Sequence, residues 1–359
     1  MKDVTQEELV VLSLGRKTSF SFVLRSLIRT FAAMKTTDVQ VAATIGFFDG
    51  VHRGHQFLVK QLQCEAQKRG LRSVVITFDR HPRQVLCPDW KPRLLTTLTE
   101  KGRLLRQTGI DDLVVLHFDE QMAALSAHDF MQQVLRQQLG VQLLLTGYDN
   151  RFGHRTAGSN EGFEDYVAYG NELGIEVVKA PPCPAVTLHD TVDGDSHAAT
   201  VSSSLIRRLL SEGRVAEAAT CLGRQYALQG TVVHGQQKGR TMGFPTANLQ
   251  LDDDCQLVPQ NGVYAVVATI DVERATFKAM TNIGLRPTFE GHRQTIETHI
   301  FGFDADLYGR QLTVEFVERL RSEQPFPSPD ALARQMALDA AAAQQILTEY
   351  SLSTLNSKG

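Results

Sequence analysis

Residues 44–55 read Thr44-Ile45-Gly46-Phe47-Phe48-Asp49-Gly50-Val51-His52-Arg53-Gly54-His55. The stretch carries an apolar strand through a glycine turn into a helix that opens with two histidines. Gly46 and Gly50 permit a tight turn and a close approach of the backbone to a ligand. The first N–H groups of the following helix have no partner within the helix, and they favour an anion. The pattern predicts a site for a nucleotide phosphate at this turn.

The two histidines strengthen that prediction. His52 and His55 stand three residues apart, so both imidazoles lie on one face of the first helical turn and can reach one phosphorus atom. The alternative is a capped helix end or a chance metal pair. Because Gly50 and Gly54 flank the histidines, we favour the phosphate site.

The chain from Val41 to about Ala180 alternates short apolar runs with helical patterns, which is typical of a doubly wound parallel sheet. The predicted strands are 41–47, 72–78, 113–118, 141–147 and 174–179, and the predicted helices are 54–69, 98–108, 126–139 and 160–173.

Polar residues follow each of these strands, where ligands bind in open α/β sheets. The segments are Phe48-Asp49-Gly50, Asp79-Arg80-His81-Pro82, Asp119, and Tyr148-Asp149-Asn150-Arg151-Phe152-Gly153. We interpret Asp119 as a turn residue, and Ser126-x-x-Asp129 as the start of a helix.

A second anion motif lies at Val201-Ser202-Ser203-Ser204-Leu205-Ile206-Arg207. Three hydroxyls before a helix are often N-caps and nothing more. Here Arg207 lies one turn beyond Ser204, so a guanidinium and hydroxyls can converge on the anion that a helix N-terminus attracts.

The sequence pattern changes from helical to β-rich after Gly223. Non-helical apolar runs with Gly and Pro punctuation predict an antiparallel β-barrel, followed by a terminal helix from about Ser328 to Tyr350. The predicted barrel strands are 228–233, 263–270, 275–283, 295–301 and 312–317.

A second nucleotide site is predicted between the first two of these strands. Glycines with Lys238, Gly239 and Arg240 can fold over a polyphosphate. Thr246 and Asn248 project from one side of an extended segment, and their oxygens suit Mg²⁺. The alternative for the basic residues is a solvated turn.

Composition limits the class of protein. A chain of 359 residues exceeds the usual size of one core, so two domains are expected. The net charge of −3 argues against a nucleic-acid partner, and no apolar run reaches the roughly 20 residues of a membrane span. The five cysteines show neither a C-x-x-C pair nor a disulfide framework, so we expect a reducing, cytoplasmic location.

The first 33 residues form an extension before the predicted fold. No acidic residue lies between Glu8 and Asp38, whereas basic residues recur. A transit peptide is one interpretation. We favour a mis-assigned start codon, with Met34 as the true beginning.

The motifs together resemble bacterial bifunctional riboflavin kinase/FAD synthetases over about Val41 to Leu347. Gly-x-Phe-Asp-Gly-x-His-x-Gly-His, Ser-Ser-Thr-x-Ile-Arg and Gly-Phe-Pro-Thr-Ala-Asn-Leu are signatures of that family. The chain departs from the family at Phe47, often Asn, at Ser204, the Thr of the second signature, and at Thr200 and Pro325, usually basic.

The resemblance implies an enzyme whose barrel phosphorylates riboflavin with ATP and Mg²⁺ and whose parallel-sheet domain adenylylates FMN with a second ATP. FMN phosphate is already a nucleophile, so no general base is assigned to the second step. The implied catalytic residues are His52, His55, Arg207 and the base Glu297. The implied nucleotide-binding residues are Gly46, Phe48, Asp49, Gly50, Gly54, Asp149, Ser203, Ser204, Lys238, Gly239 and Arg240. The implied flavin-binding residues are Asn261, Tyr264, Asn282, Arg286 and Arg321, and the implied metal ligands are Thr246 and Asn248.

The domains are accordingly predicted as an extension over 1–33, an FMN adenylyltransferase over 34–222 and a riboflavin kinase over 223–359, each able to fold alone. The expected partners are riboflavin, FMN and ATP, without nucleic acid, membrane or obligate protein partner.

Alternatives remain open at two points. Glu297 can instead be a surface residue of its strand. The chain can also be a flavin-binding regulatory protein with one inactive half, for which Phe47, Thr200 and Pro325 are the supporting departures. A cytidylyltransferase-like enzyme with an accessory barrel does not explain the flavokinase signature.

Overall fold

The structure is a computed structural model that describes residues 10–12, 40–87, 89–148, 152–154, 161–189, 196–235, 239, 243–270, 275–288 and 291–356. The chain forms two compact units, Met1–Pro184 and Ala185–Gly359. Each unit is described by itself.

The first unit is built on a parallel sheet in the order β1-β4-β3-β2-β5-β6. All five predicted strands are confirmed: β2 (Val41–Ile45), β3 (Arg72–Phe78), β4 (Asp112–Leu116), β5 (Val141–Thr146) and β6 (Glu176–Lys179). The sixth strand, β1 (Val10–Leu12), lies in the predicted extension and pairs with the edge of β4. The order of strands reverses between β2 and β5, which places the switch point of the sheet beside the β2–α2 turn.

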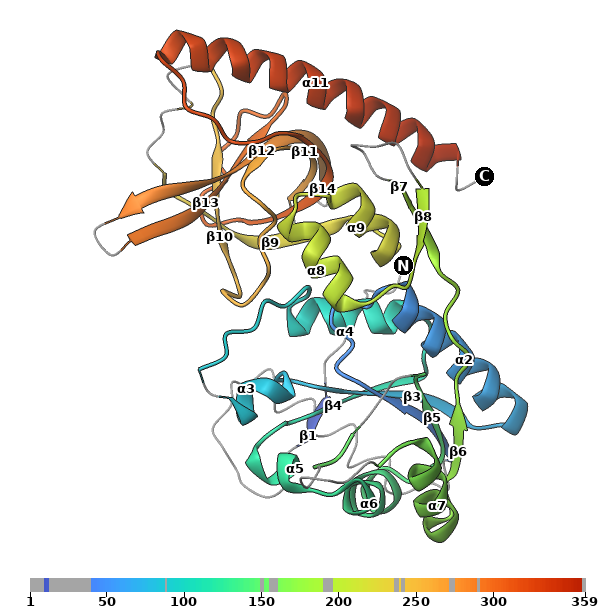
Figure 1. Cartoon of the computed structure of the whole chain (residues 1–359). Coiled ribbons are helices and arrows are strands. Elements are labelled where there is room, and N and C mark those ends of the chain that lie inside the picture. The colour runs from blue at the N-terminus through green and yellow to red at the C-terminus, as the bar shows by residue number, and fades with distance from the viewer. Residues whose placement is uncertain are drawn as a thin grey trace. The chain divides into compact units, whose positions relative to one another are not determined.

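Helices cover both faces of this sheet, as predicted (Figure 1). One core contains Ala42 of β2 and packs against α2 (Arg53–Arg69) and α4 (Leu98–Gln107). The other contains Ala43 and packs against the opposite set of helices. Because successive strand residues point to opposite faces, the apolar strands serve both cores. The opposite set comprises α5 (Glu120–Ala124), α6 (Ala127–Asp129), the π-helix η1 (Phe130–Gln138) and α7 (Phe163–Leu173), and a short α3 (Pro82–Leu86) follows β3.

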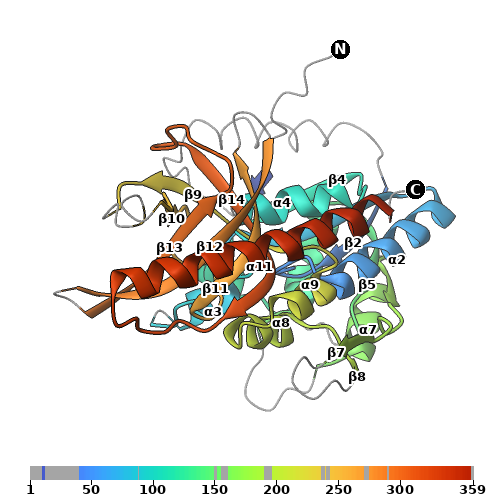
Figure 2. The same cartoon turned by 90° about the horizontal axis from the view of Figure 1, so that it is seen from above.

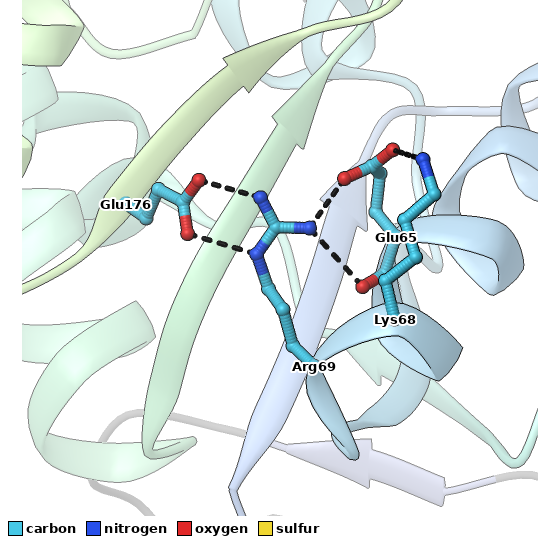
Figure 3. Close-up of polar contacts among 4 residues, drawn as sticks. All are labelled: Glu65, Lys68, Arg69 and Glu176. Atoms are coloured by element: carbon cyan, nitrogen blue, oxygen red, sulfur yellow. Dashed lines mark hydrogen bonds and ion pairs between the residues drawn. The ribbon is translucent and has the colours of Figure 1, made fainter.

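An ion-pair network joins the end of α2 to β6 (Figure 3). Arg69 donates to Glu176 Oε1 at 2.7 Å and also contacts Glu65, which in turn accepts from Lys68 at 2.7 Å. The network is partly exposed to solvent. It therefore fixes the register of the helix end more than it adds to the free energy of unfolding.

The second unit is a closed antiparallel barrel in the order β10-β13-β12-β11-β14-β9. The five predicted strands are confirmed as β9 (Tyr226–Val233), β11 (Gly262–Ile270), β12 (Ala275–Thr288), β13 (Gly291–Ile300) and β14 (Gln311–Arg321). The segment that carries Asn248, predicted only as extended, forms the sixth strand, β10 (Ala247–Leu251).

The predicted terminal helix is confirmed as α11 (Pro329–Asn356), which packs across β11, β12 and β14 (Figure 2). Ala343 and Leu347 meet the outer wall of the barrel. The buried Asp339 accepts from Arg321 at 2.7 Å. No helix within the described residues combines the length and the hydrophobicity that a membrane span requires.

The region between the parallel sheet and the barrel differs in detail from the prediction. The sequence has a helical pattern from Leu205 to Leu222, and over it the chain forms two helices, α8 (Ser203–Ser211) and α9 (Val215–Leu222). Gly213 breaks the helix because its φ of +77° is a left-handed conformation. Ahead of α8, β7 (Val186–His189) and β8 (Ser196–Ala199) pair as antiparallel strands.

Both helices belong with the barrel. Gln260 N donates to Leu210 O at 2.9 Å, and α9 packs on β9 and β14. The compact units therefore divide near Pro184, ahead of the predicted boundary at Leu222, and the functional boundary at Leu222 stays a prediction.

Candidate active sites

The β2–α2 turn has a strained backbone. Phe48 and Val51 have φ values of 54° and 40°, and Gly50 has a φ of 81°. A positive φ is unusual for a β-branched residue, and such strain persists only where the surroundings hold it. The sequence of the turn predicted the glycine but not the two strained neighbours.

Asp49 holds this turn in place. Its buried carboxylate accepts hydrogen bonds from Leu95 N at 2.9 Å and Thr96 N at 3.2 Å, and Gly50 N donates to Thr96 Oγ1 at 3.1 Å. The carboxylate oxygens fix the turn to the segment that precedes α4. The contact of Asp49 with a nucleotide stays a prediction.

The two histidines lie together at the N-terminus of α2. Their rings stack with centroids 3.6 Å apart, and His52 Nδ1 accepts from His55 N at 3.3 Å. His52 is the N-cap of the helix, so its proton lies on Nε2. The structure therefore brings together the pair that the spacing predicted.

His55 is electrically neutral in this arrangement. Burial lowers the pKa of His55 well below its ordinary value, and the neighbouring His52 and Lys101 lower this pKa further. Its buried Nδ1 has no hydrogen-bond partner among the residues that the structure describes. A buried polar atom without a partner favours a ligand at this position. Together with the free N–H groups of α2, it suits an anionic phosphate.

The other predicted residues of this turn lie between the end of β2 and the first turn of α2. Gly46 N donates to Ile76 O at 3.1 Å, Phe48 packs edge-on against the His55 ring, and Gly54 lies in the first turn of α2. Asp149 lies outside the described residues.

Lys101 is a buried residue beside this turn that the sequence interpretation missed. Its side chain is only 2% exposed, and Nζ donates to Phe47 O at 3.1 Å and Phe78 O at 2.9 Å. A signal was present: Leu98, Lys101 and Leu105 share one face of α4, and a lysine among apolar residues on a helix face is unusual.

The second anion motif begins α8. Ser202 is the N-cap and accepts from Leu205 N at 3.2 Å, which matches the capping alternative for one hydroxyl. Ser203 and Ser204 are the first two helical residues, and Arg207 is half-buried one turn later. Because α8 belongs to the second unit, the convergence of Arg207 with the histidines stays a prediction.

The barrel carries a cleft of about 310 Å³ beside the flavokinase signature. Its lining includes the signature residue Thr246 and the segment that connects β13 to β14. The lining residues are Val232, Pro245, Thr246, Ala247, Thr298, Ile300, Phe303, Asp304, Ala305, Asp306, Leu307 and Tyr308.

Three predicted site residues form a row across the barrel strands. Asn248 of β10 lies opposite Glu297 of β13, which lies opposite Asn282 of β12. Residues directly opposite each other share one face of a sheet. Thr246 Oγ1 also lies 3.5 Å from Glu297 Oε2. The row places the predicted base, one flavin residue and both metal ligands together.

This row suits Mg²⁺. Mg²⁺ keeps several waters and takes one or two protein oxygens together with substrate phosphates. Thr246, Asn248 and Glu297 supply a hydroxyl, an amide and a carboxylate oxygen. A Cβ at Gly235 would lie 2.2 Å from Asn248 Nδ2, so glycine is required there for the amide to occupy its position.

The remaining predicted flavin-binding residues differ in their surroundings. Tyr264 is fully buried, its hydroxyl donates to Gln260 O, and burial raises its pKa to about 12. Arg321 is paired with Asp339, and Asn261 Oδ1 accepts from Gln294 at 3.0 Å. Tyr264 and Arg321 therefore support the barrel in this structure.

Other predicted residues of the kinase site cannot be placed in the same way. Gly239 is described, and its carbonyl accepts from Phe244 N at 2.9 Å. Lys238 and Arg240 lie outside the described residues, and Arg286 is described only as a backbone position of β12.

Comparison with known families decides which proteins this geometry belongs to. The family model of FAD synthetase matches residues 34–190, and that of riboflavin kinase matches residues 222–347. The chain belongs to the bifunctional riboflavin kinase/FMN adenylyltransferase family. Both activities predicted from the sequence, and the two-part fold, are thereby confirmed.

Relatives of that name match most of the chain. The protein of Escherichia coli K12 is 38% identical over 302 residues, which are 84% of this chain and 91% of the relative. Those of Pseudomonas fluorescens and Bacillus subtilis are 36% and 34% identical, and each match covers 85% of this chain and 92% of the relative.

A solved structure resembles both parts of the chain. It is a crystal structure named as a macrolide-efflux protein from Streptococcus pneumoniae, with a TM-score of 0.74 and 32% identity. The match covers 86% of this chain and 95% of that one.

Proposed function

We propose that the β2–α2 turn binds the phosphates of ATP and that His52, His55 and Arg207 stabilise the α-phosphorus during adenylyl transfer. A phosphate oxygen of FMN attacks this phosphorus, and pyrophosphate leaves. Charge accumulates on the phosphoryl oxygens, so donors that are held in place before the reaction are the main source of acceleration. Neutral His55 is such a donor, and its protonation is favoured as the anion approaches.

At the second site we propose that Glu297 accepts the proton of the ribityl hydroxyl of riboflavin while that oxygen attacks the γ-phosphorus of ATP. ADP leaves and FMN is formed. Mg²⁺ held by Thr246 and Asn248 would neutralise phosphate charge. The cleft beside Thr246 would receive the nucleotide, and Asn282, which lies opposite Glu297 on the neighbouring strand, would contact the flavin.

The single observation that carries the first proposal is the stacked histidine pair at the N-terminus of α2, in which the buried Nδ1 of His55 has no partner among the described residues. For the kinase, the row Asn248, Glu297 and Asn282 has the same weight. The protein is proposed to act in the cytoplasm on riboflavin, FMN and ATP, without nucleic acid, membrane or a required protein partner.

A matched pair of variants tests both assignments. His55→Ala should lower FAD formation from FMN by roughly 10² to 10³, as for one lost transition-state donor, and leave FMN formation unchanged. Glu297→Gln keeps the shape of the side chain but not the base, so FMN formation should fall by about 10² to 10⁴ while supplied FMN still becomes FAD.

Each variant is the control for the other, because both sites are on one chain. Unchanged FAD formation in His55→Ala would remove this histidine from the reaction. Normal kinase activity in Glu297→Gln would return Glu297 to a surface role. If the unmodified protein has only one of the two activities, the result would instead favour the alternative of a flavin-binding regulatory protein with one inactive half.

A further inference from the structure

Lys101 is a buried cation directly beneath the β2–α2 turn. Its ammonium group donates to the carbonyl of Phe47, which follows β2, and to the carbonyl of Phe78, the last residue of β3. These carbonyls lie at the carboxyl ends of two adjacent parallel strands. Lys101 therefore links the phosphate-binding turn to the neighbouring strand.

Within the described part of the chain, no carboxylate oxygen forms a salt bridge with Lys101. The carboxylates of Asp49 and Asp79 act on its charge and raise its pKa, but burial has the larger and opposite effect. Asp49 accepts from Leu95 and Thr96, and Asp79 is bonded to His117. A buried charge without an oppositely charged group in contact with it destabilises the folded state, so a buried lysine at this position favours a role in the site.

The ring of Phe47 provides a further contact. Nζ of Lys101 lies 3.9 Å from the centroid of this ring, a cation–π arrangement. Phe47 is the residue of the first family signature, residues 46–55, at which the family often has Asn. The aromatic side chain and the buried lysine are thus parts of one feature, and the departure does not disable the turn.

We propose that Lys101 is a positioning residue for adenylyl transfer, which holds the turn through the Phe47 and Phe78 carbonyls and adds a fixed positive charge behind the phosphate site. The phosphates of ATP would bring further negative charge close to this ammonium group. The same charge adds to burial and to His52 in lowering the pKa of His55. This inference rests on the proposed role of His55 in the same reaction.

Lys101→Met tests the proposal, because methionine has a similar shape without the charge. We expect FAD formation from FMN to fall roughly 10- to 100-fold, the range for a residue that orients a site from behind. FMN formation by the same sample should not change. Lys60→Met, which removes an exposed lysine of α2, is the matched control and should leave both activities unchanged.

A pH profile separates this role from simple packing. Burial lowers the pKa of Lys101 to about 8. The groups that face it are Asp49 and Asp79, the latter bonded to His117, and the stacked pair of His52 and His55. FAD formation by the unmodified protein should decline above about pH 8, whereas the first unit should become more stable there, since the folded form no longer buries a charge.

The decline in activity and the gain in stability should both be absent in Lys101→Met. The variant Lys101→Arg stays charged, so it should lack the decline in activity. A double-mutant cycle with Phe47→Leu should show coupling in the rate of FAD formation. If Lys101→Met does not fold, Lys101→Arg and the profile of the unmodified protein still decide the question.

Undiminished FAD formation in folded Lys101→Met, or a decline at high pH that persists in Lys101→Arg, would overturn the inference. If His55→Ala also had no effect, the proposed active site itself would be wrong. If only His55→Ala lowered the rate, the failure would be confined to Lys101.

Discussion

At the scale of single residues, two imidazoles and one ammonium group share the turn after β2, and only part of this arrangement follows from the sequence. The spacing of His52 and His55 predicts their common face, because residues three apart meet on a helix. The sequence does not predict that the side chains of Asp49 and Tyr264 point inward. A short motif does not show which of its side chains bond to other protein atoms and which bond to the ligand. Lys101 was missed because it lies far along the chain from the motif it supports.

His55 provides a prediction at this scale. In the folded state its pKa is lowered by burial below the ordinary value of about 6.5, so the folded state binds fewer protons than the unfolded state between these two values. The stability that neutral His55 contributes is fully present above about pH 6.5 and is lost as the pH falls through the folded pKa.

We therefore expect His55→Gln to flatten the fall in unfolding free energy between about pH 7 and about pH 5. The only tryptophan of the chain, Trp90, lies in the first unit, so its fluorescence follows urea unfolding of that unit. The exposed His154 provides the control substitution His154→Gln, which should keep the pH dependence. A pH dependence in His55→Gln equal to that of the unmodified protein would contradict the account.

At the scale of elements, the apolar runs of β2 to β6 were predictable because strands buried on both faces are nearly all apolar. The strand β10 was not predicted, because its five residues Ala-Asn-Leu-Gln-Leu carry a polar alternation that also reads as an extended loop. The break between α8 and α9 depends on Gly213, and a single glycine within a helical pattern is often tolerated.

The packing of α9 changes what is expected of isolated parts. Val215, Ala218, Cys221 and Leu222 of α9 are buried in the second unit. A fragment over 185–359 should therefore be a soluble riboflavin kinase without adenylyltransferase activity. A fragment over 223–359 exposes the surface that α9 covers, so it should melt at a lower temperature and aggregate sooner.

Thermal unfolding and riboflavin phosphorylation by the two fragments, measured side by side, check this prediction. Equal melting temperatures and equal activities would show that α8 and α9 add nothing to the barrel and would support a structural boundary at Leu222. A 185–359 fragment that folds but cannot phosphorylate riboflavin would show that the kinase needs residues of the first unit.

At the scale of the whole molecule, the fold class, the number of compact units and both reactions were predictable from sequence, because each half carries its own signature and its own hydrophobic pattern. The structural boundary was not, since the helices that follow the second anion motif pack on the barrel. The second anion motif, which we propose to serve adenylyl transfer, thus lies in the unit that contains the riboflavin kinase match.

The central claim is that one chain carries out two consecutive attacks on phosphorus. The most direct test is to incubate the full-length protein with riboflavin, ATP and Mg²⁺ and to resolve the flavins by chromatography over time. FMN should appear first and then be converted to FAD, with release of ADP and then pyrophosphate. A chain that forms no FMN from riboflavin, or that forms FMN but never converts added FMN to FAD, would contradict the central claim.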